Sequence, residues 1–286
     1  MDVKLLKLRD ESYPQILKDI PDPPSQLYYT GLPLDELLKS PRVAIVGSRK
    51  ATPYGRQVTI ELSTSLARAA VVIVSGLAFG IDSYAHRTAL EAGGQTIAVL
   101  PTSLDNIYPS SHWQLAQQIL KSGGLMSEYS PRTEGFPVNF IARNRIVSGL
   151  ADVLLITEAA KNSGTMHTAR FALEQGKTVM AVPGNITSPI SEGCNNLIKS
   201  GATPVTNVDD IFFALKINPL TAKTKVVFKG KPQEQLVFEL ISQGISQQEE
   251  IASSSKLSTP DINSALTMLE LGGYIRAQGA GHWTIA

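Results

Sequence analysis

The sequence predicts an α/β protein with a parallel sheet covered by helices on both faces, followed by a small C-terminal winged-helix domain. From residue 42 to residue 182, short and continuously apolar runs alternate with helical stretches, which is typical of parallel strands buried on both faces. Residues 233–286 show three helical stretches and then two short strands around Gly279 and Gly281, the order of a winged helix-turn-helix. The expected domains are an N-terminal preface at 1–40, the α/β domain at 41–216, a linker at 217–232 and the winged-helix domain at 233–286.

Each element has its own signal in the chain. Strands are expected where apolar residues run without interruption, at 43–46, 71–74, 96–100, 125–127, 153–157 and 178–182. Helices are expected between them and in the tail, at 54–69, 82–92, 111–121, 165–175, 234–243, 248–253 and 260–271. In the preface, Pro21, Pro23 and Pro24 force extended chain between a capped helical turn that begins at Ser12 and a second helical turn at 35–39.

Composition limits the kind of protein and its partners. Hydrophobic residues make up 43% of the chain and charged residues 18%, as in an ordinary soluble globular protein. The net charge is +1, so a nucleic-acid partner would need a local basic patch. The single cysteine, Cys194, allows no disulfide framework within the chain. The N-terminus lacks the apolar core of a signal peptide, and the apolar run Ala69–Ile81 has 13 residues where a membrane helix needs roughly 20. We therefore expect a cytoplasmic protein without membrane contact.

Three loops that follow strands carry small polar residues. In open parallel sheets, ligands bind beyond the carboxyl ends of the strands. The residues found there are Gly47, Ser48, Arg49 and Lys50 after the first strand, Ser75 and Gly76 after the second, and Ser163, Gly164 and Thr165 after a later one. Glycine lets the backbone approach an anion, and the free N–H groups of a helix start donate to it. The three loops together predict a phosphate cradle, whereas any one of them alone is more typical of an ordinary strand-to-helix turn.

A basic cluster is the second signal for an anionic partner. Its expected DNA-binding members are Phe140, Arg143, Asn144 and Arg145. Arginine binds phosphate with two parallel hydrogen bonds, and asparagine donates to phosphates or base edges. An exposed Phe140 would stack on an unpaired base. The alternative is a helix with solvated arginines and Phe140 in the core.

Signatures of cofactor chemistry are missing from the chain. No Gly-x-Gly-x-x-Gly follows the first strand, so the dinucleotide fingerprint is absent. Gly176-Lys177-Thr178 imitates the end of a Walker A motif, but Phe171 stands where the motif has glycine, and the triplet leads into a strand. The four histidines are scattered, and no set of side chains has the spacing of a metal site. We therefore expect no cofactor, no metal and no turnover.

Asp82 and His86 lie one helical turn apart on the helix after the second loop. A catalytic acid–base pair is conceivable there. We favour a structural role, in which Asp82 caps the helix and His86 is part of the scaffold.

At these motifs the sequence resembles the DprA/Smf family of DNA-processing proteins. The matching stretches are 13–14, 22–24, 27–28, 43–49, 75–82 with 85–86, 125–129, 140–146, 163–165, 181–184 and 192–198. They occur in the family's order and cover about residues 12–215.

The resemblance implies an extended Rossmann-like fold that dimerises. It implies a protein that binds and protects single-stranded DNA and helps to load the RecA recombinase during natural transformation, and the family is not known for enzymes. The pocket that it implies is lined by Gly47, Ser48, Arg49, Ser75, Gly76, Arg143, Asn144 and Arg145.

The chain departs from the family's pattern in two places. Many members begin with a helical SAM-like domain, for which residues 1–40 are too short. After Gly164 the chain reads Thr165-Met166-His167-Thr168, where the family usually has two aliphatic residues. We expect the helix start to survive that change.

Two alternative functions remain open from the sequence. The first is a nucleotide-processing enzyme of a related Rossmann type, for which Glu158 and the Ser163–Thr165 stretch are a faint signal. The second is a transcription regulator that uses the winged helix.

The charges of residues 233–286 argue against recognition of double-stranded DNA by the winged-helix domain. Its third helix has no lysine or arginine and carries Asp261 and Glu270, and its second helix begins with Glu249 and Glu250. These carboxylates would repel a phosphate backbone. We therefore expect residues 233–286 to be a protein-contact or regulatory module that DNA binding does not require.

Overall fold

The computed structural model describes residues 3–133, 135–217, 230–242, 244–255, 257–279 and 281–285. It divides into two compact units, Met1–Lys225 and Val226–Ala286, and each is described by itself. Most of the linker expected at 217–232 lies outside the described residues. No helix in the described part of the chain is long and apolar enough to cross a membrane.

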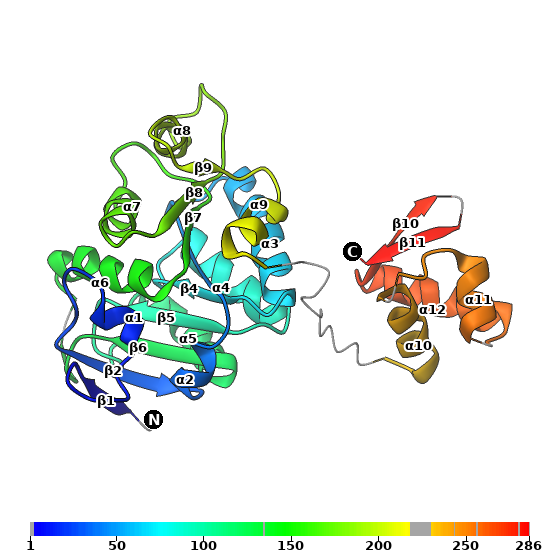
Figure 1. Cartoon of the computed structure of the whole chain (residues 1–286), viewed down its shortest axis with the longest axis horizontal. Coiled ribbons are helices and arrows are strands. Elements are labelled where there is room, and N and C mark those ends of the chain that lie inside the picture. Colours follow the sequence, from blue (N-terminus) through cyan, green and yellow to red (C-terminus); the bar gives the residue numbers. More distant parts are fainter. Residues whose placement is uncertain are drawn as a thin grey trace. The chain divides into compact units, whose positions relative to one another are not determined.

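The first unit is built on one nine-stranded sheet (Figure 1). Its strands, from one edge to the other, are β1 (Lys4–Lys7), β2 (Gln26–Gly31), β6 (Gly123–Ser127), β5 (Thr96–Leu100), β4 (Val72–Ser75), β3 (Arg42–Val46), β7 (Val153–Ile156), β8 (Thr178–Ala181) and β9 (Thr203–Pro204). From β6 to β9 all neighbours pair in parallel, and β1 and β2 are antiparallel. The predicted α/β class with a mostly parallel, Rossmann-like sheet is confirmed.

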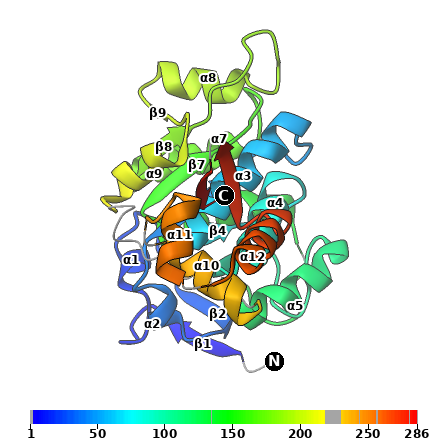
Figure 2. The ribbon, with the colours of Figure 1, turned by 90° about the vertical axis from the view of Figure 1, so that its right-hand side faces the viewer.

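Helices cover both faces of this sheet (Figures 1 and 2). One face carries α1 (Gln15–Lys18), α2 (Leu34–Leu37), α6 (Pro137–Leu150), α7 (Thr165–Glu174) and α8 (Glu192–Lys199). The other carries α3 (Pro53–Arg68), α4 (Ile81–Glu91), α5 (Trp113–Ser122, after the 3₁₀ turn Ser110–His112) and α9 (Val208–Leu215). Successive side chains of β3 show why: Ala44 and Val46 pack into the first core, and Val43 and Ile45 into the second. The strand is apolar throughout because both of its faces are covered.

Residues 4–31 hold two strands that the sequence did not indicate. β2 pairs with β6 and β1 pairs with β2, so the N-terminal segment is part of the main sheet. The helical turn near Ser12 begins later than predicted and has no side-chain cap: α1 follows Pro14. The Tyr13 hydroxyl instead donates to the carbonyl of Pro24 at 2.7 Å and fastens the proline-rich stretch to the start of this turn.

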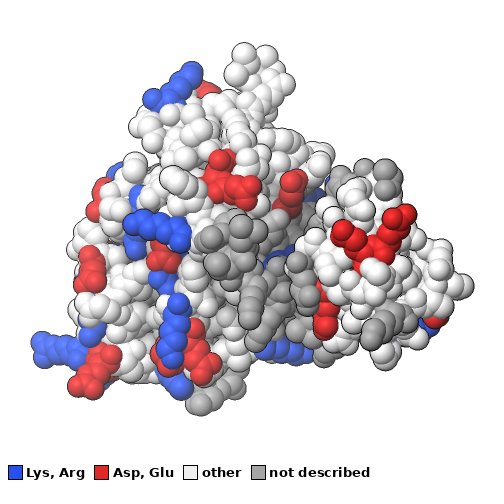
Figure 3. All heavy atoms as spheres, turned by 45° about the vertical axis from the view of Figure 1, so that its right-hand side comes forward, with Lys and Arg blue, Asp and Glu red and all other residues white. Residues whose placement is uncertain are grey.

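The second unit is a small winged helix with its own core. It consists of α10 (Pro232–Ser242), α11 (Gln248–Ser255), α12 (Thr259–Leu271) and the antiparallel hairpin β10 (Ile275–Gly279) and β11 (His282–Ile285). Ile262, Leu266 and Leu269 of α12 are buried in that core, as predicted from their helical spacing. Asp261 and Glu270 of the same helix are exposed. In Figure 3 the visible face of this unit carries more acidic than basic side chains.

Candidate nucleic-acid interface

The loops after β3, β4 and β7 meet at the carboxyl edge of the sheet, as the parallel topology requires. Together with the start of α6 they enclose a cavity of about 500 Å³. Its lining includes ten of the residues singled out in the sequence: Gly47, Ser48, Arg49, Lys50, Phe140, Arg143, Asn144, Ser163, Gly164 and Thr165. The lining also includes Asp82, Ile141 and Thr168, which sequence reasoning did not assign to a site.

Arg143 lies at the bottom of this cavity. Arg143 is only 4% exposed, and its guanidinium donates to the carbonyl oxygens of Gly76 and Val99. No described carboxylate lies within ion-pair distance of it. Burial lowers the pKa of Arg143 to about 10, and the nearby charge of Arg49 acts in the same direction, while Asp82 opposes both. The group is still a cation at neutral pH, and it is a buried cation that lacks a direct counter-ion.

The β4–α4 loop is shaped around that guanidinium. A Cβ on Gly76 would stand 2.3 Å from a guanidinium nitrogen of Arg143, so a larger residue at this position would have to displace the guanidinium. The backbone N–H groups of Gly76 and Ala78 donate to Oδ2 of Asp82, at 3.1 and 3.4 Å. The prediction that Asp82 caps its helix is wrong, because α4 has no side-chain cap and this carboxylate orders the preceding loop. Burial raises the pKa of Asp82, against the opposing effects of Arg143 and of these hydrogen bonds.

His86 is part of the scaffold, as expected. It is fully buried, and its Nδ1 lies 2.7 Å from the hydroxyl of Thr96. Since the Thr96 hydroxyl donates to the carbonyl of Ile73, Nδ1 of His86 is the donor in this pair. Burial lowers the pKa of His86 to about 3, with His112 and Arg143 adding to the shift, so the ring is neutral at neutral pH.

The start of α7 points backbone donors at the cavity. Within the described residues, the N–H groups of Arg49, Gly164 and Thr165 donate to no protein acceptor. The Ser163 hydroxyl is buried and has no hydrogen-bond partner among these residues. The Thr165 hydroxyl donates to the Gly47 carbonyl at 3.1 Å and thereby joins the two loops. Free N–H groups at a helix start, with two arginines opposite, form a site for an anion.

Three of the predicted residues, Ser75, Gly76 and Arg145, do not line this cavity, and Gly76 borders the smaller cavity beside it. Ser75 is fully buried, and its hydroxyl donates to the carbonyl of Ile45 on the neighbouring strand at 2.6 Å, because Ser75 is still the last residue of β4. Arg145 is two residues from Arg143 on α6, and positions two apart on a helix point in different directions.

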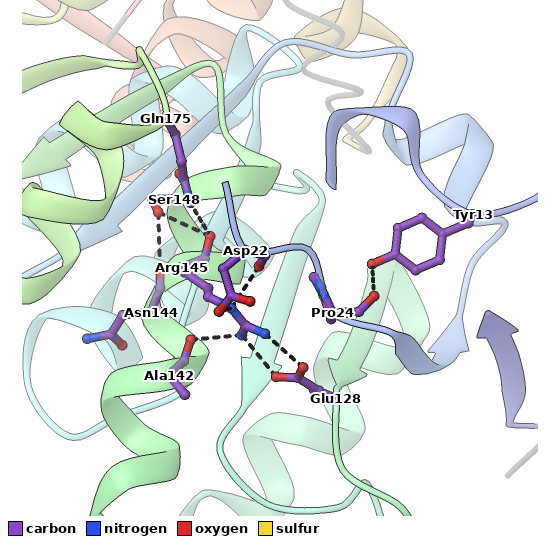
Figure 4. Close-up of polar contacts among 9 residues, drawn as sticks. All are labelled: Tyr13, Asp22, Pro24, Glu128, Ala142, Asn144, Arg145, Ser148 and Gln175. Carbon is purple, nitrogen blue, oxygen red and sulfur yellow. Dashed lines mark hydrogen bonds and ion pairs between the residues drawn. The ribbon is translucent and has the colours of Figure 1, made fainter. Parts of the chain in front are cut away.

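The Arg145 side chain instead forms a clasp with two carboxylates (Figure 4). It makes a two-pronged pair with Glu128, with nitrogen–oxygen distances of 2.8 and 2.9 Å. Its Nε lies 2.7 Å from a carboxylate oxygen of Asp22 and donates to the Asp22 carbonyl at 2.9 Å. Arg145 therefore holds the N-terminal segment and the end of β6 against α6, and its charge is already neutralised.

Glu158, the residue on which the enzyme alternative depends, is 2% exposed. Its carboxylate accepts hydrogen bonds from the backbone N–H and the hydroxyl of Thr52, the N-cap of α3. It does not line the cavity that holds Arg49 and Arg143. It borders a separate cavity of about 420 Å³ with Thr52, Tyr54 and Pro183. Its hydrogen bonds to Thr52 position the start of α3.

A smaller cavity adjoins the large one. It is lined by Arg49, Gly76, Ala78, Phe79, Pro101, Tyr108, Pro109, Phe140 and Arg143. Sequence reasoning missed Phe79 and Tyr108. Their position in loops that follow β4 and β5, at the same edge as the other predicted residues, is the signal that would have found them.

Comparisons with known proteins agree with this architecture. Residues 4–216 match the family described as DNA recombination-mediator protein A, and residues 223–281 match the family described as DprA winged helix domain. The chain is 43% identical over 202 residues to the DNA processing protein DprA of Streptococcus pneumoniae, covering 71% of each protein. It is 37% identical to the protein Smf of Escherichia coli over an alignment of 289 residues, covering 97% of this chain and 76% of the relative.

A solved structure shows the same fold. It is that of DNA processing protein A from Helicobacter pylori, described for its single-stranded DNA binding mode. It matches with a TM-score of 0.68 and 36% sequence identity, over 76% of this chain and 96% of that one. The resemblance expected from the motifs is therefore confirmed, and the chain belongs to the DNA recombination-mediator protein A (DprA/Smf) family of DNA-processing proteins.

Proposed function

We propose that this chain binds the backbone of single-stranded DNA in the cavity at the carboxyl edge of the sheet. In this proposal Arg49, Arg143 and the N-terminus of α7 hold phosphates, and the protein protects the strand and helps to load the RecA recombinase onto it during natural transformation. It acts as a cytoplasmic homodimer, assembled through the Rossmann-like unit, and has no catalytic step. The solved structure of the H. pylori relative, which is described for its single-stranded DNA binding mode, supports the choice of ligand.

The buried guanidinium of Arg143 carries this proposal. A buried charge without a direct partner is unfavourable unless a ligand completes it. Arg49 at the rim is exposed and, among the described residues, has no ion-pair partner. A phosphate diester between the two arginines would receive charge-assisted hydrogen bonds from both and from the backbone of α7.

The absence of catalysis is proposed on similar grounds. A hydrolase or transferase needs an acid or base within hydrogen-bonding reach of the substrate. Glu158 is committed to Thr52, and Asp82 is committed to the backbone of the β4–α4 loop. The cavity is thus better suited to holding a phosphate diester than to cleaving it.

Binding is expected to favour single strands and to tolerate sequence changes. The cavity offers donors for phosphates and few groups placed to read base edges, since Asn144 is its single amide side chain among the described lining residues. Filter binding should show that a thymine oligonucleotide binds more tightly than a duplex of equal length. The logarithm of affinity should fall with the logarithm of salt concentration, with a slope of about −0.7 per phosphate neutralised. Equal or tighter binding of the duplex contradicts the proposal.

The winged-helix unit is expected to be dispensable for this binding. Its α12 exposes Asp261 and Glu270, and the start of α11 exposes Glu249 and Glu250, so phosphate would be repelled. A chain truncated near residue 218 keeps the three hydrophobic core clusters of the first unit and should bind single-stranded DNA about as well as the full chain. A folded truncated protein that loses most of its affinity would show that the unit contributes to DNA binding.

A further inference from the structure

Two aromatic side chains are unusually exposed beside the phosphate cavity. Phe79 is 47% exposed and Tyr108 is 46% exposed, and both line the small cavity that also reaches Arg49 and Arg143. They come from different loops, after β4 and after β5. Apolar rings held in water next to two arginines are typical of a binding surface rather than of a core.

Both rings are supported from behind. The Tyr108 ring meets the Phe140 ring edge to face, with centroids 5.1 Å apart and planes at 83°. The Arg49 guanidinium lies 5.5 Å from the centroid of Phe140. Phe140 is half-buried between these two groups, so it supports them instead of offering an open face. Phe79 meets His112 at 5.0 Å and 67°, and His112 is buried and hydrogen-bonded to the Leu77 carbonyl at 2.9 Å.

The small cavity beside these rings has no room for a base. The small cavity measures about 20 Å³, roughly the room for one water molecule. A nucleobase does not fit into this cavity, whereas the exposed parts of Phe79 and Tyr108 are accessible to it. Stacking on such faces needs no hydrogen-bond readout and is tolerant of sequence.

We propose that Phe79 and Tyr108 form a stacking platform for unpaired nucleobases, with Phe140 and His112 as its supports. This proposal rests on the proposed binding of single-stranded DNA and adds a second recognition element to it. The phosphates of the strand lie on the arginine side, and its bases turn toward the platform. A duplex keeps its base faces stacked internally, so the platform recognises the single-stranded state itself.

An abasic oligonucleotide separates stacking from phosphate contacts. Equilibrium binding is measured for a thymine oligonucleotide and for an abasic one with the same number of phosphates. The wild type should bind the abasic strand at least tenfold more weakly, as expected for the loss of one base stack. Tyr108→Ala and Phe79→Ala should each weaken binding of the thymine strand several-fold and leave binding of the abasic strand within about twofold of wild type. Tyr108→Phe keeps the ring and should behave as wild type.

Tyr54→Ala is the matched control, because Tyr54 is also 46% exposed and lines neither of the two cavities that reach Arg49 and Arg143. It should leave the preference for the thymine strand unchanged, and thermal unfolding should show all variants folded. A wild type that binds both strands equally, a preference that survives in both alanine variants, or an equal loss in Tyr54→Ala overturns the platform. Absence of measurable binding to either strand instead overturns the proposed function.

Discussion

Replacing Arg49 by alanine should weaken binding of single-stranded DNA about 10- to 100-fold, the value of one charge-assisted contact to phosphate. Arg49 is exposed in the β3–α3 loop and, among the described residues, forms no ion pair. Its removal should therefore cost little stability. Arg49→Lys should restore only part of the affinity, because an ammonium group cannot form the two-pronged contact of a guanidinium. Fluorescence anisotropy with a labelled thymine oligonucleotide measures all three proteins.

Arg170→Ala provides the control for net charge. Arg170 is exposed on α7, pairs with Glu174 one turn away and does not line the cavity. Both alanine variants lose one positive charge, so a long-range electrostatic effect would weaken them alike. If a folded Arg49→Ala protein keeps wild-type affinity, Arg49 does not belong to the binding site.

Replacing Arg145 by alanine should reduce the free energy of unfolding by about 3 kcal/mol, because a partly buried pair loses one partner and Glu128 is left without its cation. For a unit of this size the melting temperature should fall by roughly 5–10 °C. Thermal unfolding followed by circular dichroism measures the change. The contacts that the variant removes are the ion pairs of Arg145 with Asp22 and Glu128.

The same variant distinguishes a structural arginine from a DNA-binding one. At a temperature where it is folded, Arg145→Ala should bind single-stranded DNA within about threefold of wild type, since Arg145 does not line the cavity. Arg145→Lys should recover part of the stability through its charge. An unchanged melting temperature together with a large loss of affinity would show that Arg145 binds DNA and does not stabilise the fold.

The sequence predicted the site's location because parallel topology places the carboxyl ends of the strands at one edge. Gly47 and Ser163 lie far apart in the chain, yet the continuous apolar run before each of their loops is enough to predict that they meet. The structure explains the glycine at position 76 by the close approach of the Arg143 guanidinium. The spacing of residues in the sequence does not predict that Arg143 is the side chain that approaches it.

The errors arise where side-chain direction decides the outcome. Arg143 and Arg145 were treated as one cluster because they are close in sequence. Positions two apart on a helix point in different directions, so Arg143 reaches the cavity and Arg145 pairs with Glu128. Asp82 looked like a cap because it opens a helix, whereas the preceding loop offers it two N–H groups. β1 and β2 escaped notice because their pairing partner, β6, comes about a hundred residues later, and local pattern carries no information about such a partner.

The two outer strands of the sheet bear on how copies of this protein can associate. β1 has four residues with lysine at both ends, and β9 has two residues, of which Pro204 lacks an N–H group. Short, charged or proline-containing edges resist the addition of a further strand. Neither edge can therefore serve as a template for growth of a continuous sheet from molecule to molecule. The main sheet is in this way protected from edge-to-edge aggregation between molecules.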